Sequence, residues 1–156
     1  MLFRSHVTLT SEISPSTYSS DPQAWLNSLN LPSGDGVQVT FGQLASEDVF
    51  VRKLYIQCAK SDGLKELARA CRREVDGFGE DAKATEWTND KYNPHVSLLY
   101  HDCPPVDAKG ISKVEEFVRP TLARNGGLSG WCGGRVVLVQ TDKPIDQWTP
   151  IAERKL

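Results

Sequence analysis

Two short segments of this chain share one alternating pattern: a histidine, an apolar residue, a hydroxyl residue and a second apolar residue. The first is HVTL at residues 6–9, and the second is HVSL at residues 95–98. Strict alternation is typical of a β-strand, because successive side chains of a strand point to opposite faces. The pattern therefore predicts two strands that each direct a histidine and a hydroxyl group to one face and aliphatic side chains to the other.

The rest of the chain predicts further strands that alternate with helices. Strands are expected over residues 6–10, 37–44, 48–59, 95–100 and 135–141, and helices over residues 22–29, 61–75 and within 107–124. A long polar connection is expected over residues 76–94 and a glycine-rich turn over residues 125–134, and residues 143–156 receive no assignment. Asp21 before Pro22 is a favourable helix start, since the aspartate can cap the helix and proline suits its first position.

The order of these elements is repeated along the chain. The second half reads strand, helix, histidine strand, helix, strand, and the first half reads histidine strand, helix, strand. The two orders match if a leading strand and helix are missing from the first half. We therefore expect residues 1–156 to form one domain of two pseudo-symmetric lobes, each of which contributes one histidine strand, with the first lobe incomplete.

Composition limits the class of protein. The chain has 156 residues and a formal net charge of −2, which gives no broad basic face for a long nucleic acid. No run of about 20 apolar residues is present, as a membrane span requires, and the N-terminus has no secretory pattern. We predict an intracellular, cytoplasmic monomer with four free and mostly buried cysteines.

The repeated residue types suit acid–base chemistry at a phosphate. Imidazole has an ordinary pKa of about 6.5, so it exchanges protons readily near neutral pH. His6 and His95 could therefore act as base and acid on opposite sides of a phosphoryl centre, while Thr8 and Ser97 donate hydrogen bonds to its oxygens. Neither motif supplies the third ligand that a metal site normally needs, so we predict no metal and no cofactor.

The segments HVTLT and PHVSLLY resemble the paired motifs of the two-histidine phosphoesterases, and in particular the cyclic phosphodiesterases of fungi and plants. The resemblance implies hydrolysis of 2′,3′-cyclic nucleotides to 2′-nucleotides, with a small cyclic-phosphate nucleotide as substrate. It implies ADP-ribose 1″,2″-cyclic phosphate, a by-product of tRNA splicing, as a second substrate. It also implies an association with the Golgi. The fold that it implies is a bilobal α+β arrangement of two antiparallel sheets around a cleft, with an extra strand and helix before the first motif.

The same resemblance assigns the tyrosine that closes the second motif, Tyr100, to substrate binding. Strict alternation turns Tyr100 away from His95, so this role needs a bend or bulge at the strand end. Two other functions remain open at this stage. One is a phosphoesterase of the same superfamily that acts on RNA ends or 2′–5′ linkages, and the other is a truncated, inactive nucleotide-binding module.

Other conspicuous residues have competing interpretations. Trp87 and Tyr92 could stack on a nucleobase or pack within the protein. His101 is expected in an exposed turn, and residues 68–74 are expected to form a solvated helix face. The glycine-rich stretch at 125–134 leads into a strand rather than a helix, which argues against a phosphate-binding loop.

Overall fold

The computed structural model describes residues 5–124 and 129–156. The helices are α1 (Pro15–Tyr18), α2 (Pro22–Ser28), α3 (Asp62–Arg72), α4 (Asp81–Asp90) and α5 (Ala108–Arg124), with single 3-10 turns η1 (Gly34–Gly36), η2 (Phe50–Arg52) and η3 (Ile145–Gln147). The strands are β1 (Gln38–Ala45), β2 (Leu54–Cys58), β3 (His95–Leu99), β4 (Gly130–Cys132), β5 (Arg135–Val139) and β6 (Pro150–Lys155). Residues 125–128 of the predicted glycine-rich turn lie outside the described part.

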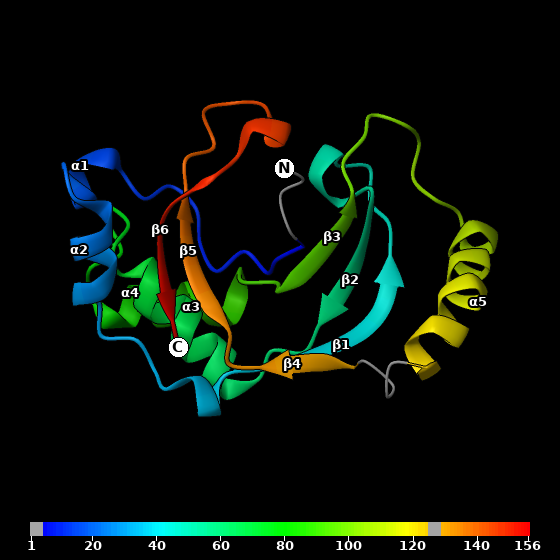
Figure 1. The fold of residues 1–156 in the computed structure, drawn as a ribbon, viewed down its shortest axis with the longest axis horizontal. Coiled ribbons are helices and arrows are strands. Elements are labelled where there is room, and N and C mark those ends of the chain that lie inside the picture. The colour runs from blue at the N-terminus through cyan, green and yellow to red at the C-terminus, as the bar shows by residue number, and fades with distance from the viewer. Residues whose placement is uncertain (1–4, 125–128) are drawn as a thin grey trace.

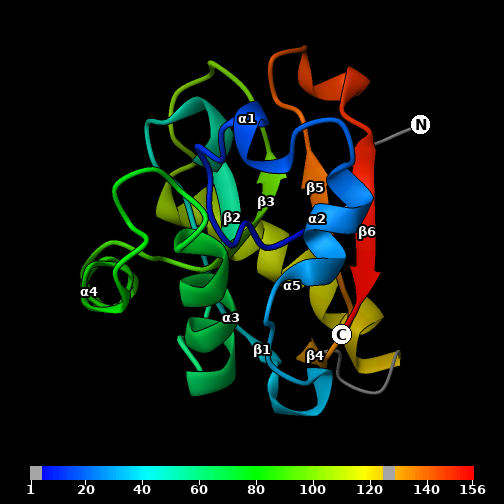
Figure 2. The same ribbon diagram turned by 90° about the vertical axis from the view of Figure 1, so that its left-hand side faces the viewer.

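These strands form two antiparallel sheets. The larger has the order β3-β2-β1-β4, and β5 pairs with β6 in the smaller. Figure 1 shows the larger sheet as a curved layer with α5 on its outer side, and the smaller sheet with α2 on its outer side. The α3 and α4 helices pack beside each other, as Figure 2 shows with α4 seen nearly end-on. The predicted α+β class is confirmed.

The two best-predicted helices begin at the expected caps. The Asp21 carboxylate accepts a hydrogen bond from the backbone N–H of Ala24 at 2.8 Å, with Pro22 in the first position of α2. The Ser61 hydroxyl accepts one from the N–H of Leu64 at 3.4 Å at the start of α3. Each cap satisfies a backbone donor that the helix itself leaves unpaired.

The core lies between the two sheets and the helices α2 and α3. Its buried members come from both sheets, from these helices and from the connections before β1 and after α4: Leu26, Val37, Val39, Leu64, Leu67, Ala68, Tyr92, Val136 and Ala152. In α3, Leu67 and Ala68 lie three and four positions after Leu64, as the helical period requires for one buried face. The core therefore joins the two sheets into one body.

Several elements differ from the sequence expectation. The predicted polar connection over residues 76–94 contains α4, of which only Ala84 and Thr88 are buried. The unassigned tail contains β6, and the predicted strand over residues 48–59 is reduced to β2 behind the η2 turn. Of the four cysteines only Cys71 is buried, so the prediction of mostly buried thiols is wrong. No helix in the described residues is long and apolar enough to cross a membrane.

Candidate active site

The first motif lies on an extended segment, residues 5–13, that is not a regular strand. A single antiparallel bridge joins its Val7 to Val96 of β3. Val7 and Leu9 pack against the hydrophobic core, so side-chain packing holds the segment where a full ladder of backbone hydrogen bonds does not. In Figure 1 the segment crosses between the two sheets. The expected strand over residues 6–10 is therefore wrong in form, although its alternation is retained.

The end of this segment explains why pairing does not continue. Glu12 has a φ of 69°, in the left-handed region that strand residues do not adopt. The Arg72 guanidinium donates to the backbone carbonyl of Ser11 at 3.5 Å, which occupies an acceptor that a neighbouring strand would use. Arg72 is itself buried, so the expectation of a solvated helix face over residues 68–74 is wrong at this position.

The second motif lies on β3, and its alternation is regular. Val96 is buried on one face, while His95 and Ser97 share the other. On the neighbouring strand β2, Gln57 is paired with His95 and Tyr55 with Ser97. The face that carries the histidine is therefore polar across both strands.

The bridge between Val7 and Val96 brings the two motifs together. Because paired residues of an antiparallel bridge point to the same side, their neighbours on both chains point to the opposite side. This register sets His6 across from Ser97 and Thr8 across from His95. Cβ atoms of directly opposed residues are about 5 Å apart. The register thus sets each histidine opposite the hydroxyl residue of the other motif.

The His95 ring is held by two contacts. Its Nδ1 lies 2.8 Å from the backbone carbonyl oxygen of Asn93. Since a carbonyl only accepts, Nδ1 carries the proton, and in the neutral ring Nε2 is left with its lone pair. The ring also meets Tyr55 edge to face, with the ring centroids 5.4 Å apart. Nε2 can therefore accept a proton, or donate one after it has been protonated.

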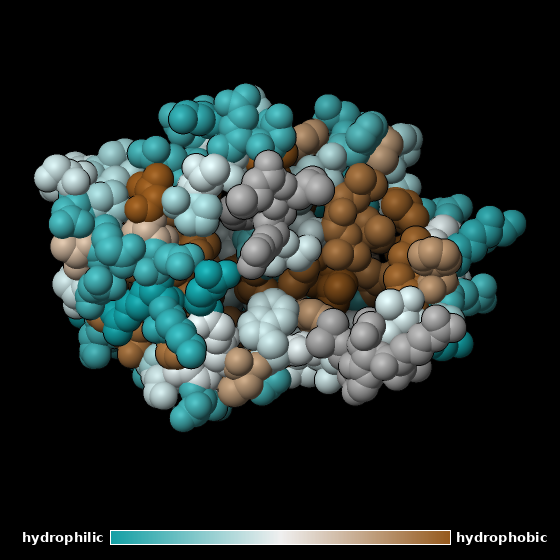
Figure 3. Space-filling model, in the orientation of Figure 1, coloured by the Kyte–Doolittle hydropathy of each residue, from teal (hydrophilic) through white to brown (hydrophobic). Residues whose placement is uncertain are grey.

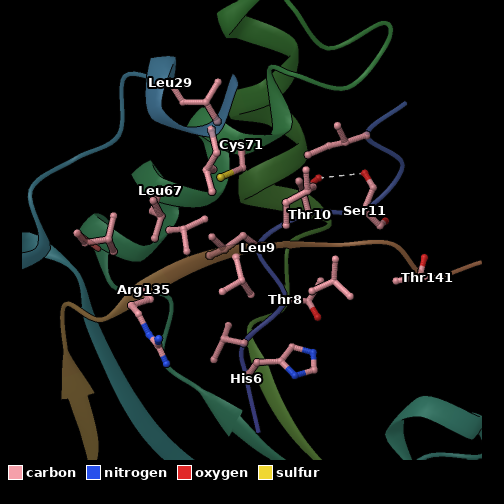
Figure 4. A pocket seen from close by; sticks show the side chains of 18 of the residues that line it. His6, Thr8, Leu9, Thr10, Ser11, Leu29, Leu67, Cys71, Arg135 and Thr141 are labelled. Carbon is pink, nitrogen blue, oxygen red and sulfur yellow. Dashed lines mark hydrogen bonds between the residues drawn. The ribbon is translucent and has the colours of Figure 1, made fainter. Parts of the chain in front are cut away.

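The two hydroxyl groups have different surroundings. The Ser97 hydroxyl donates to the backbone carbonyl of Val51 in the η2 turn at 2.7 Å. Thr8 is exposed, and Figure 4 shows it turned to the same side as His6, whereas Leu9 points away towards Leu67. In this structure the Thr8 side chain is therefore open to a ligand, and the Ser97 proton is engaged by the protein.

A bulge interrupts the pairing of β3 with β2 just before Tyr100. Ser97 pairs with Tyr55 but Leu99 pairs with Leu54, so Leu98 is an extra residue on β3. One extra residue reverses the alternation within the strand beyond it, so that Leu99, the last residue of β3, no longer shares the face of Ser97. The bulge that the Tyr100 assignment requires is thus present.

The η2 turn beside the second motif exposes apolar side chains. Tyr100 contacts Phe50 of this turn, with the ring centroids 6.3 Å apart. Val49, Phe50, Val51 and Leu98 are all exposed. Figure 3 shows an apolar area over this part of the molecule. An aromatic and aliphatic surface therefore adjoins the histidine face.

Two cavities border the motif residues. His6 and Thr8 line one with a volume of about 960 Å³, and His95 lines another of about 370 Å³. Both lie in the range of small-molecule sites, which is about 300–1,000 Å³. The two cavities share no lining residue, and neither is lined by Ser97 or Tyr100. The two histidines therefore line separate cavities, although the bridge sets their motifs opposite each other.

The smaller cavity has polar lining residues that the sequence did not single out. Arg52 forms an ion pair with Glu47 at 2.9 Å, and the Tyr55 hydroxyl donates to the same carboxylate at 2.5 Å. Burial, together with this hydrogen bond, raises the pKa of Tyr55 and keeps the phenol protonated. Alternation within β2 places Tyr55 and Gln57 on one face. Their position beside His95 depends on a pairing that the sequence does not specify.

The amino-acid sequence matches that of known proteins along its whole length. The family model described as "Cyclic phosphodiesterase-like protein" matches residues 1–156. The chain belongs to this family. A protein of Phaeosphaeria nodorum named 2′,3′-cyclic-nucleotide 3′-phosphodiesterase is 60% identical over 99% of this chain and 81% of its own length. Proteins of the same name from Neurospora crassa and Yarrowia lipolytica are 42% and 28% identical, over 78% and 83% of their lengths. No solved structure matches.

Two thiols also border the cavities of this cyclic phosphodiesterase-like chain. Cys71 lines the larger cavity, and burial raises the pKa of its thiol to about 12. Cys58 lines the smaller cavity, and burial raises its pKa as well. A thiol with a raised pKa stays protonated and is a weak nucleophile. Burial therefore disfavours the thiolate form of both cysteines.

The remaining aromatic and histidine residues have structural contacts. Trp87 on α4 packs on Tyr92 with ring centroids 5.6 Å apart, and Tyr92 is buried in the core. These contacts favour the packing interpretation over base stacking. His101 is exposed, and its Nδ1 accepts a hydrogen bond from the N–H of Cys103 at 2.8 Å. In this family member, His101 therefore lies in a turn as expected.

Proposed function

We propose that this chain hydrolyses 2′,3′-cyclic nucleotides to 2′-nucleotides by acid–base catalysis with two histidines. The observation that carries the proposal is the antiparallel bridge between Val7 and Val96, which turns both motifs to one face. The relatives named 2′,3′-cyclic-nucleotide 3′-phosphodiesterase support the reaction and the substrate class. The exposed Thr8 and the oriented ring of His95 supply groups that such a reaction needs.

In this proposal one of His6 and His95 takes a proton from water as its oxygen bonds to phosphorus. The bond from phosphorus to O3′ breaks, and the other imidazole donates its proton to that oxygen. Protons and electrons balance without a further reactant. The carbonyl of Asn93 stabilises the positive ring whenever His95 is protonated, because it accepts from Nδ1 in both charge states. Which histidine acts as the base stays open.

Hydroxyl groups would stabilise the charged phosphate oxygens in the transition state. Thr8 can donate directly, and Ser97 can do so after its hydroxyl turns from Val51. Tyr100 would contact the substrate from the bulged end of β3. ADP-ribose 1″,2″-cyclic phosphate from tRNA splicing and an association with the Golgi stay predictions, as do the monomeric state and the exclusion of long nucleic acids.

The test is hydrolysis of 2′,3′-cyclic AMP in the presence of EDTA. We expect turnover that EDTA leaves unchanged, and a loss of about 10²–10⁴-fold in His6→Ala, because a positioned acid or base contributes about that much. The product should carry a 2′-phosphate, which phosphorus NMR distinguishes from a 3′-phosphate. Absence of turnover by the folded wild type, or full turnover by His6→Ala, would contradict the proposal.

The exposed hydroxyl of Thr8 gives a separate prediction. We expect Thr8→Val to lower kcat by about 10²-fold, since removing one donor to a developing negative charge has an effect of that size. Thr8→Ser retains the hydroxyl and should retain most of the rate. Steady-state kinetics on both variants measure the contrast. A loss in Thr8→Ser with none in Thr8→Val would mean that the methyl group, and not the hydroxyl, matters at this position.

A further inference from the structure

The segment that carries His6 has little backbone pairing, and one buried arginine holds its far end. We propose that Arg72 is a positioning residue that fixes this segment against β3 and thereby sets the position of His6. The inference rests on the proposed function for the role of His6. It concerns a residue of α3 outside both motifs, with no place among the proposed acid, base and phosphate-binding groups.

The contacts of Arg72 converge on three consecutive residues. Its Nη1 lies 3.4 Å from the Thr10 hydroxyl, 3.5 Å from the Ser11 carbonyl oxygen and 3.3 Å from the Glu12 carboxylate. Figure 4 shows Thr10 and Ser11 at the opposite end of the segment from His6. Arg72 therefore contacts the segment just after the alternating residues of the first motif.

Two aromatic rings fix the guanidinium itself. Its central carbon lies 3.8 Å from the centroid of the Phe78 ring and 4.6 Å from that of Trp87. The Arg72 side chain is only 6% exposed. A planar guanidinium stacks on aromatic rings in a way that a lysine ammonium does not reproduce. The cation is thus held by α3, α4 and the loop between them, all of which belong to the scaffold.

The Arg72 contacts begin at Thr10, only two residues after Thr8 of the motif. Each residue of an extended chain advances about 3.3 Å, so a shift at Thr10 is carried along the segment to Thr8 and His6. Val7 and Leu9 resist movement away from the core, but apolar packing alone does not fix a shift along the chain. Arg72 supplies polar contacts that do. Misplacing a catalytic group by about 1 Å can lower a rate by about 10²-fold.

The experiment compares Arg72→Met with Arg73→Met, a matched control at the C-cap of α3 whose side chain is half exposed and paired with Asp81. We expect Arg72→Met to lower kcat about 10- to 100-fold with a small change in KM. We also expect hydrogen exchange of those amides of residues 6–12 that the bridge to Val96 protects to accelerate about tenfold or more, while the α3 amides stay protected. Arg72→Lys should fail to restore either property, and Arg73→Met should match the wild type.

Hydrogen exchange keeps this test separate from the test of catalysis. Faster exchange confined to residues 6–12 supports the positioning role even if the wild type proves inactive on cyclic nucleotides. Unchanged exchange in a folded Arg72→Met, or the same effect in Arg73→Met, would overturn it. If Arg72→Met does not fold, Thr10→Val combined with Glu12→Leu removes two side-chain acceptors of the Arg72 guanidinium at the far end of the segment. That pair should accelerate exchange in the same residues, and unchanged exchange there would overturn the inference.

Discussion

Replacement of His95 by alanine should lower kcat/KM for 2′,3′-cyclic AMP by about 10²–10⁴-fold, the usual contribution of a positioned general acid or base. The loss is expected because Nε2 of this ring can move a proton while the Asn93 carbonyl holds Nδ1. The ring is only half-buried, so its removal leaves a small void and should change the melting temperature little. Steady-state kinetics and thermal unfolding measure the two effects.

The third histidine of the chain supplies the control for His95→Ala. His101 is exposed and contacts the backbone of its own turn, so His101→Ala should retain the wild-type rate. The double variant of His6 and His95 should lose little more than either single variant, because groups that act together give non-additive losses. A folded His95→Ala with the wild-type rate would remove this residue from the mechanism.

The sequence predicted which residues of each motif share a face, but it did not predict that the two motifs contact each other. Alternation alone implies that His95 and Ser97 share a side, and β3 confirms it. The contact of Val7 with Val96 joins residues 89 positions apart, and no local pattern contains that information. The Tyr100 assignment needed a bulge that alternation cannot predict, because the bulge depends on how β3 pairs with β2.

The missed elements share a physical cause, which is a weak local pattern compensated by tertiary contacts. The α4 helix buries only Ala84 and Thr88, so its sequence resembles a polar loop until α3 packs beside it. The β6 strand begins at Pro150 and becomes a strand by pairing with β5. Arg72 was assigned to a solvated face because arginine is rarely buried, and its burial depends on the two rings that enclose its guanidinium.

The second large effect concerns Gly63, in the first turn of α3. Helix propensity alone predicts that Gly63→Ala stabilises the protein by about 1 kcal/mol. A Cβ at this position would lie 1.8 Å from the backbone carbonyl oxygen of Gly36, at the end of η1. Backbone atoms cannot yield as a flexible side chain does, so α3 and η1 must separate. We expect the clash to prevail and to destabilise the fold by about 3 kcal/mol.

That loss corresponds to a fall in melting temperature of about 6–12 °C for a chain of this size. Gly79→Ala is the matched control, because a Cβ there meets nothing within 4 Å and its residue is exposed. It should be neutral or stabilise the fold by up to about 1 kcal/mol. Denaturant unfolding of both variants gives the comparison. If Gly63→Ala were as stable as Gly79→Ala, the close approach of α3 to η1 would be contradicted. The position of α3, the helix that carries Arg72, would then be contradicted as well.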